Sequence, residues 1–232
     1  MIRWALRTLA AIVGLLLAAF LAYQGYVAVR LWWWDDHNPT STAFMDARLV
    51  TMREKSSAAR LQQQWVPYSK ISNNLKRAIL VAEDDKFVDH EGFDWDGIQK
   101  AREKNEKKGK VVAGGSTITQ QLAKNLFLSG DRSVIRKGEE ALITVMMEHI
   151  LDKERILEIY LNVIEWGDGV FGAEAASRHY YGVSASQLSV EQAAKLAAMV
   201  PRPRFYDRNR NAPWLMKKTQ ISIERMPRAQ LP

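Results

Sequence analysis

Two glutamates lie in sequence contexts that suit acid–base chemistry. Glu83 follows a run in which Leu75 and Ile79 recur at helical spacing, so we expect it near the end of a helix. Glu140 lies four residues after Arg136, which places both on one helical face. A carboxylate can take a proton from a hydroxyl group, and charged groups can support a departing anion. Each glutamate also has a plainer interpretation, as a surface carboxylate or half of a helical ion pair.

Basic residues form a second group with a chemical interpretation. A short segment of small residues, Gly114 to Thr117, precedes them and suits the close approach of a phosphate to a helix start. The Gly-x-x-x-x-Gly-Lys spacing of a P-loop is missing. Basic residues in such numbers are usually a solvated face, but near a phosphate they would stabilise its negative charge. The four are Lys124, Arg132, Arg136 and Lys137.

Several chemistries are excluded by residue type. Cysteine is absent, which rules out disulfides, thiolate zinc sites and a cysteine nucleophile. The histidines show no His-Glu-x-x-His or comparable metal-binding spacing; they are His37, His90, His149 and His179. The net charge of +7 favours anionic partners such as nucleic acid, phospholipid headgroups or phosphorylated substrates.

The N-terminal segment makes membrane phosphate the leading candidate and argues against nucleic acid. Leu9 to Val29 carries no charge and is long enough, as a helix, to cross a hydrocarbon core of roughly 30 Å. Arg3 and Arg7 precede it and favour a cytoplasmic N-terminus, although Arg30 weakens the asymmetry. Trp32 to Trp34 would form an interfacial aromatic belt. A cleavable signal peptide would have a shorter apolar core, so we predict an uncleaved anchor.

The rest of the chain predicts one compact, mainly α-helical domain. Apolar spacing of three and four residues runs through 116–126, 134–150, 153–164 and 190–200, and no stretch alternates as a strand. The highly charged stretch from Lys100 to Lys110 is expected to be a solvated loop. We predict a cytoplasmic tip and anchor at 1–31, a linker at 32–44, a catalytic domain at 45–215 and a C-terminal tail at 216–232.

Four segments, in this order, resemble the signature of the family 51 glycosyltransferases, the peptidoglycan polymerases. They are EDDKFVDHEG at 83–92, GGSTITQQLAKNLF at 114–127, RKGEEALITVMMEHILDKERILEIYLN at 136–162 and FGAEAASRHYYG at 171–182. The anchor-plus-domain plan is similar to that of the monofunctional members. The resemblance implies a lysozyme-like, mainly α-helical domain behind one transmembrane helix, with a cleft opening at the membrane surface.

The resemblance also implies a reaction. The substrate would be lipid II, undecaprenyl-pyrophosphoryl-MurNAc(pentapeptide)-GlcNAc, polymerised with inversion into β-1,4-linked strands and releasing undecaprenyl pyrophosphate. The protein would be single-pass in the bacterial cytoplasmic (inner) membrane, with a periplasmic domain. Its partners would be lipid II, the lipid-linked growing strand, the membrane, and the division or elongation machinery with its transpeptidases. It would not cross-link, because Ser-x-x-Lys and Lys-Thr-Gly are absent.

Residue roles follow from the same resemblance. Glu83 would be the base acting on the acceptor hydroxyl and Glu140 would support the leaving group. Lys124 and Arg132 would contact the pyrophosphate, while Arg136 and Lys137 would position Glu140 and add positive potential. The cleft would be lined by Ser116, Gln120 and Gln121. A divalent cation, Mg²⁺ or Mn²⁺, could bridge carboxylate and pyrophosphate, but nothing in the sequence demands one.

The remaining motif residues are interpreted structurally. Asp84 and His90 are expected to hold the turn that orients Glu83, and Glu148, Tyr160 and Asn162 to belong mainly to the core. The basic, proline-rich stretch PRPRFYDRNRNAP at 201–213 is less like the family, so it carries no prediction of substrate contacts.

Two other functions stay open from sequence. A lysozyme-like muramidase would direct water at the glycosidic bond, although a hydrolase has little need for Lys124 and Arg132. A non-enzymatic, membrane-anchored scaffold would explain the charge and the anchor but not the segments around Glu83 and Gly114.

Overall fold

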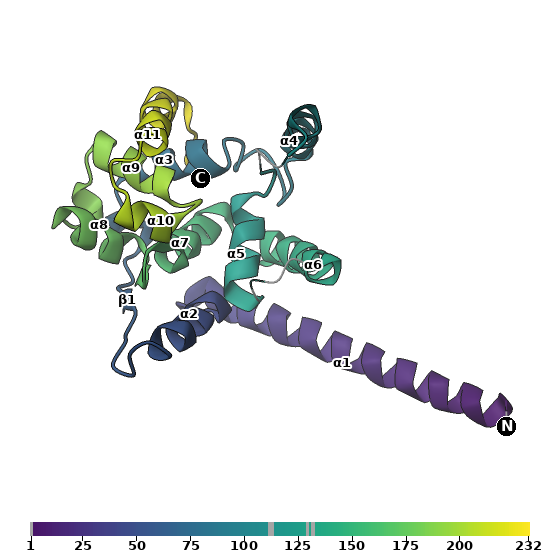
Figure 1. The fold of residues 1–232 in the computed structure, drawn as a ribbon. Coiled ribbons are helices and arrows are strands. Elements are labelled where there is room, and N and C mark those ends of the chain that lie inside the picture. Colours follow the sequence, from purple (N-terminus) through teal and green to yellow (C-terminus); the bar gives the residue numbers. More distant parts are fainter. Residues whose placement is uncertain (1, 111–113, 129, 131–132) are drawn as a thin grey trace.

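The computed structural model describes residues 2–110, 114–128, 130 and 133–232, and it is mainly α-helical, as expected (Figure 1). The first helices, with the short strand and 3₁₀ turn among them, are α1 (Ile2–Asp36), α2 (Ala43–Arg53), β1 (Gln62–Gln63), η1 (Tyr68–Lys70), α3 (Asn73–Glu83), α4 (Trp95–Lys108), α5 (Ile118–Phe127) and α6 (Val134–Ile150). The elements that follow are α7 (Lys153–Val163), β2 (Glu165–Gly167), β3 (Val170–Phe171), α8 (Ala173–Tyr181), η2 (Ala185–Gln187), α9 (Val190–Met199), α10 (Pro203–Arg208), α11 (Pro213–Arg225) and η3 (Met226–Arg228).

Helix α1 projects from the globule as a single rod (Figure 1). It is the helix, among the described residues, that is long and apolar enough to cross a membrane. Its last turns dock on the domain, where Val27 and Leu31 are buried. The Gln24 side chain donates to Glu139 Oε1 of α6 at 2.7 Å, and Arg155 donates to the carbonyl oxygen of Trp34 at 2.8 Å. These polar contacts tie the end of the apolar helix to α6 and α7.

The three tryptophans at the end of α1 do not form a uniform belt. Trp32 and Trp33 are exposed, whereas Trp34 is only 3% exposed. Its ring lies 5.3 Å from that of Phe127, and the Arg30 guanidinium lies 4.5 Å from the Trp34 ring centroid. The expectation of an interfacial belt is therefore wrong for Trp34, because its position on the helix turns it toward α5.

Two packed groups of helices make the core. Helix α9 packs against α3 and α11, while α5 packs against α6 and α7. Figure 1 shows α5 crossing the centre of the molecule between the α3–α9–α11 group and α6. The apolar faces follow the spacing of three and four that the sequence predicted. Fully buried members include Leu75, Ile79, Ile118, Leu122, Ile143, Met147, Ile156, Leu157, Leu196 and Leu215.

The charged stretch 100–110 is helical over most of its length, so the expectation of a loop there is wrong. Asp94 caps the start of α4 by accepting from Gly97 N at 3.0 Å. Gly109 ends the helix in the left-handed conformation, with φ of 60°. Between them the i,i+4 pair of Arg102 and Glu106, at 2.8 Å, stabilises an exposed helix that has few apolar contacts. The helix is therefore capped at both ends, although it has few apolar residues.

A small sheet, which the sequence did not predict, joins segments far apart in the chain. Its strand order is β1-β3-β2, with β1 parallel and β2 antiparallel to β3. Strands of two or three residues are too short to show alternation. Gly172 follows β3 with φ of 80°, and a Cβ there would lie 2.6 Å from the carbonyl oxygen of Asn162. Glycine is therefore required where this sheet meets α7.

The C-terminal residues pack on the domain. Thr219 and Ser222 of α11 are buried, and so is Met226 of η3. Both elements contact α3, which is the helix that ends at Glu83. The residues expected to form a tail thus help to hold the helix that carries the candidate base.

Candidate active site

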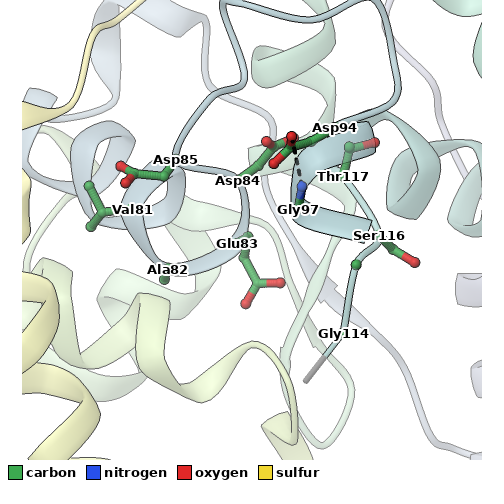
Figure 2. Close-up of a pocket in the computed structure, with 11 residues that line it drawn as sticks. Val81, Ala82, Glu83, Asp84, Asp85, Asp94, Gly97, Gly114, Ser116 and Thr117 are labelled. Atoms are coloured by element: carbon green, nitrogen blue, oxygen red, sulfur yellow. Dashed lines mark hydrogen bonds between the residues drawn. The ribbon is translucent and has the colours of Figure 1, made fainter. Parts of the chain in front are cut away.

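Glu83 is the last residue of α3 and lines a pocket. Ser72 caps the start of this helix by accepting from Leu75 N at 3.1 Å, and the backbone leaves the helical conformation at Asp84, with φ of −161°. The pocket is lined by the end of α3, the start of α4 and residues 114–117. In Figure 2 the Glu83 and Asp84 carboxylates point in opposite directions. Both residues line the pocket, but their carboxylates face different neighbours.

Asp84 and His90 hold the turn that follows Glu83. Asp84 accepts from Ile118 N at 2.9 Å and from His90 Nε2 at 2.9 Å. The other ring nitrogen, Nδ1, accepts from Gly92 N at 3.1 Å. This pattern requires a neutral imidazole with its hydrogen on Nε2. Asp84 thus joins the end of α3 to the start of α5, and neither it nor His90 is left available for proton transfer.

Gln121 and Tyr160 form a hydrogen-bonded chain that ends on Glu83. Gln121 Nε2 donates to Glu83 Oε2 at 2.8 Å, and the Tyr160 hydroxyl donates to Gln121 Oε1 at 3.0 Å. Tyr160 is fully buried in α7. Sequence reasoning assigned it to the core, and its burial agrees. Its contact with Gln121 was not predicted, because helical spacing shows which side chains are buried but not where a hydroxyl points.

The environment of Glu83 shifts the pKa of its carboxyl upward. Burial raises the pKa of this carboxyl, and the nearby charge of Asp84 raises it further. The bond from Gln121 and the charges of Lys218 and Lys124 oppose that shift. The pKa is raised on balance. A carboxylate with a raised pKa is a stronger base than an exposed one, which suits removal of a hydroxyl proton.

Lys124 lies one helical turn beyond Gln121 on α5. Within the described part of the chain its ammonium group has no hydrogen bond or ion pair. Burial lowers its pKa, an effect opposed by the negative charges of Glu140 and Glu83. It lines a second pocket together with Gln121, Glu165 and Arg204. A half-buried cation without a partner can stabilise an incoming anion.

Glu140 is enclosed by the two cations that precede it on α6. It accepts from Arg136 Nη1 at 2.6 Å and from Lys137 Nζ, and the residue is 3% exposed. Lys137 also reaches Ser116 Oγ at 3.5 Å. Both Glu140 oxygens are thus occupied, which makes Glu140 an anchor for Arg136 and Lys137. Arg132 lies outside the described residues.

The start of α5 is already satisfied by protein groups. Asp84 accepts from Ile118 N, while Thr117 and Gln120 form a capping box, with bonds of 3.1 and 3.2 Å between them. The sequence-based expectation that amides here face a phosphate is therefore not supported, because Asp84 occupies that place. The side-chain oxygen of Gln120 accepts the hydrogen bond of the cap from Thr117 N, and Gln120 also lines a third pocket beside Lys137 and Ser116.

The pockets adjoin one another. Ser116 lines both the Glu83 pocket and the pocket beside Lys137. The Glu83 pocket and the Lys124 pocket have separate linings, but Gln121 of the second pocket donates to Glu83 of the first. Glu83 and Lys124 therefore line separate pockets that Gln121 links, and the two groups are close enough for their charges to interact. The arrangement places a base beside a line of cations.

Some residues in this region were missed by sequence reasoning. Glu165 of β2 is 6% exposed and lies 3.4 Å from the guanidinium nitrogens of both Arg48 and Arg204. Burial raises its pKa, although both arginines oppose this. Arg204 comes from the basic stretch 201–213, whose charge was the only signal available. The tertiary fold brings that stretch to the pocket of Lys124.

The described residues do not supply an assembled metal site. No group of three histidine, aspartate or glutamate side chains gathers among them, and the oxygens of Glu140 are engaged by Arg136 and Lys137. A bridging Mg²⁺ or Mn²⁺ would need ligands from the substrate as well as from Glu83.

Comparisons with known proteins agree with this geometry. The family model described as transglycosylase matches residues 50–227. A biosynthetic peptidoglycan transglycosylase of Nitrosospira multiformis is 61% identical over 216 residues, covering 93% of this chain and 94% of the relative.

Two further relatives with the same description cover still more of the chain. The Dechloromonas aromatica protein is 61% identical, with 99% of this chain and 98% of the relative covered. The Laribacter hongkongensis protein is 58% identical over the full length of both chains. This chain therefore belongs to the transglycosylase family and is a lysozyme-like peptidoglycan glycosyltransferase.

Proposed function

We propose that the enzyme polymerises lipid II into β-1,4-linked glycan strands and releases undecaprenyl pyrophosphate. The observation that carries this proposal is the juxtaposition of Glu83 with the ammonium of Lys124, unpaired among the described residues, across Gln121. The reaction needs a base for the acceptor hydroxyl and positive charge for the leaving diphosphate. Both groups are available within one region of the surface.

The bond changes assign a role to each side. The acceptor hydroxyl oxygen bonds to the anomeric carbon of the donor as the bond from that carbon to the diphosphate oxygen breaks. The hydroxyl proton passes to Glu83, and the electron pair of the broken bond leaves with the diphosphate. Because attack and departure occur on opposite faces, a single displacement inverts the anomeric centre.

The cations would receive the diphosphate. Lys124 would contact it directly, and Arg136 and Lys137 would add positive potential while Glu140 keeps them in place. Arg132 would contact the diphosphate as well. Ser116 and Gln121 would line the cleft, and Gln120 would act mainly through the cap of α5.

A product analysis tests this function directly. The full-length protein, incubated with lipid II in detergent or bilayers, should convert it to long glycan that a muramidase then digests to disaccharide peptides. Release of muropeptides from preformed glycan, without polymer from lipid II, would instead identify a hydrolase. If protein shown to be folded gives neither product, the non-enzymatic scaffold is the correct function.

We further propose that α1 is an uncleaved anchor that crosses the inner membrane once and leaves the domain in the periplasm. The anchor would occupy 1–31, the connection 32–44, and the catalytic domain would begin at 45. Packing of α11 and η3 supports extending that domain beyond 215. Val134 and Ile135, 89% and 87% exposed at the start of α6, would meet lipid beside α1, because Gln24 binds the same helix.

Cysteine labelling tests this topology, because the natural chain contains no cysteine. Ala5→Cys marks the start of α1, and Ser186→Cys marks an exposed position of η2. A membrane-impermeant maleimide should label Cys at 186 in intact spheroplasts, and Cys at 5 only after permeabilisation. The reverse pattern would exclude a periplasmic domain, and loss of the Ala5→Cys label from the mature protein would show that the segment is cleaved.

Cross-linking of the product would require separate partners. The chain has no Ser-x-x-Lys or Lys-Thr-Gly motif. A separate transpeptidase would therefore have to cross-link the strands that this enzyme makes. We propose that it works beside such enzymes in the division or elongation machinery.

A further inference from the structure

The chain from Tyr160 through Gln121 to Glu83 is directional. The Tyr160 hydroxyl donates to Gln121 Oε1, which leaves the amide nitrogen facing Glu83 Oε2. Glu83 Oε2 is therefore occupied, whereas Oε1 has no hydrogen bond among the described residues. The two oxygens of this carboxylate are thus distinct, and Oε1 is the one left available to take a proton.

The alternative orientation of Gln121 is costly because Tyr160 is fully buried. If the amide flipped, its nitrogen would face the Tyr160 oxygen and the phenol hydrogen would lose its acceptor. A buried donor without a partner is strongly disfavoured. Burial raises the pKa of Tyr160 well above its ordinary value, so the group stays a phenol that donates. Tyr160 therefore fixes which end of Gln121 meets Glu83.

We propose that Tyr160 is a positioning residue for the transfer reaction: through Gln121 it holds Glu83 as a carboxylate with Oε1 available for the acceptor proton. This inference rests on the proposed role of Glu83 as the base. Tyr160 itself is held away from the reacting atoms by Gln121. Tyr160 acts by favouring the orientation in which the Gln121 amide nitrogen donates to Glu83. This orientation stabilises the ionised carboxylate over the protonated acid.

The other groups facing Glu83 set the scale of this effect. Asp84 follows it in the chain, Lys124 faces it from α5, and Lys218 from α11. Asp84 raises the pKa of Glu83 and the two lysines lower it. None of these groups contacts Tyr160 by a hydrogen bond among the described residues. Removing the Tyr160 hydroxyl should thus weaken the Gln121 bond while leaving the surrounding charges in place.

The test is the pH profile of Tyr160→Phe. Activity requires ionised Glu83, so it rises as the pH passes upward through the pKa of that carboxyl. Loss of the hydroxyl weakens the bond that lowers this pKa, so the acid limb of kcat should move to higher pH by roughly half a unit. The kcat on the high-pH plateau should stay within about twofold and KM should not change. Tyr181→Phe, which removes a hydroxyl bonded to Gln192 O at 3.5 Å in α9, is the matched control.

A second background tests the coupling. In Gln121→Leu, which removes the amide, adding Tyr160→Phe should produce no further shift of the acid limb. An equal shift in both backgrounds would overturn the inference, as would an unmoved limb in Tyr160→Phe. Infrared titration of the Glu83 carboxyl band, identified by its loss in Glu83→Gln, reports the same shift without turnover. If Glu83→Gln polymerises normally, the assignment of the base fails; if it is inactive while Tyr160→Phe titrates like wild type, only the Tyr160 role fails.

Discussion

Replacing Glu83 with glutamine should reduce the rate of glycan polymerisation by about 10² to 10⁴-fold, the range typical of a general base. Glutamine keeps the size of the side chain and an oxygen that can accept from Gln121, so packing at the end of α3 is retained. Only the ability to take the acceptor proton is lost. The measurement is the initial rate of polymer formation from lipid II at saturating concentration.

Glu224→Gln provides the control for this change. Glu224 is exposed on α11, with a hydrogen bond from Gln220 at 3.0 Å, and its replacement should leave the rate unchanged. Circular dichroism melting should give the same transition for both variants as for the natural protein. A Glu83→Gln protein that keeps clearly more than about a hundredth of the activity would show that the base lies elsewhere, because loss of a base costs at least about 10²-fold.

Replacing Lys124 with methionine should lower kcat by about 10² to 10³-fold, the cost typical of removing one group that stabilises transition-state charge. Methionine keeps most of the apolar stem, so burial on α5 is preserved while the ammonium is lost. The leaving diphosphate would then lack the cation that we propose contacts it directly. Substrate affinity should fall less than kcat, because charge on the diphosphate oxygen increases as the bond breaks.

The pH profile separates this role from simple packing. Burial lowers the pKa of Lys124, so activity should fall on the alkaline side as the ammonium deprotonates below the ordinary lysine range. In Lys124→Arg the guanidinium stays charged, so that alkaline limb should move to higher pH. Lys107→Met, at an exposed position on α4, should change neither rate nor profile. An unchanged alkaline limb in Lys124→Arg would remove Lys124 from the charge-stabilising role.

The family motifs and their spacing were sufficient to identify the chemistry. Glu83, Lys124 and Glu140 were chosen from their motifs, and the helical spacing around them correctly predicted α3, α5 and α6. Local sequence determines such features because a helix needs only an apolar face and caps, both of which lie within a few residues of one another. The apolar N-terminal helix was predictable for the same reason.

The spacing of apolar residues did not predict two other features, the helix over 95–108 and the hydrogen bond between Asp84 and Ile118. The helix over 95–108 was missed because it has few apolar residues, and its ends are marked by the caps at Asp94 and Gly109 instead. The start of α5 was expected to face a phosphate, but its Ile118 N donates to Asp84, which lies 34 residues earlier in the chain. No local pattern records such a distant partner.

The sequence by itself therefore determined the reaction class, the mainly α-helical fold and the candidate base. Only the tertiary structure decided that Lys137 reaches Ser116, that Arg204 reaches the pocket of Lys124, and that Tyr160 orients Gln121. The physical reason is that residue type and spacing specify what a side chain can do and which face it occupies. Its partners, and hence its charge state and orientation, depend on which distant helices pack against that face.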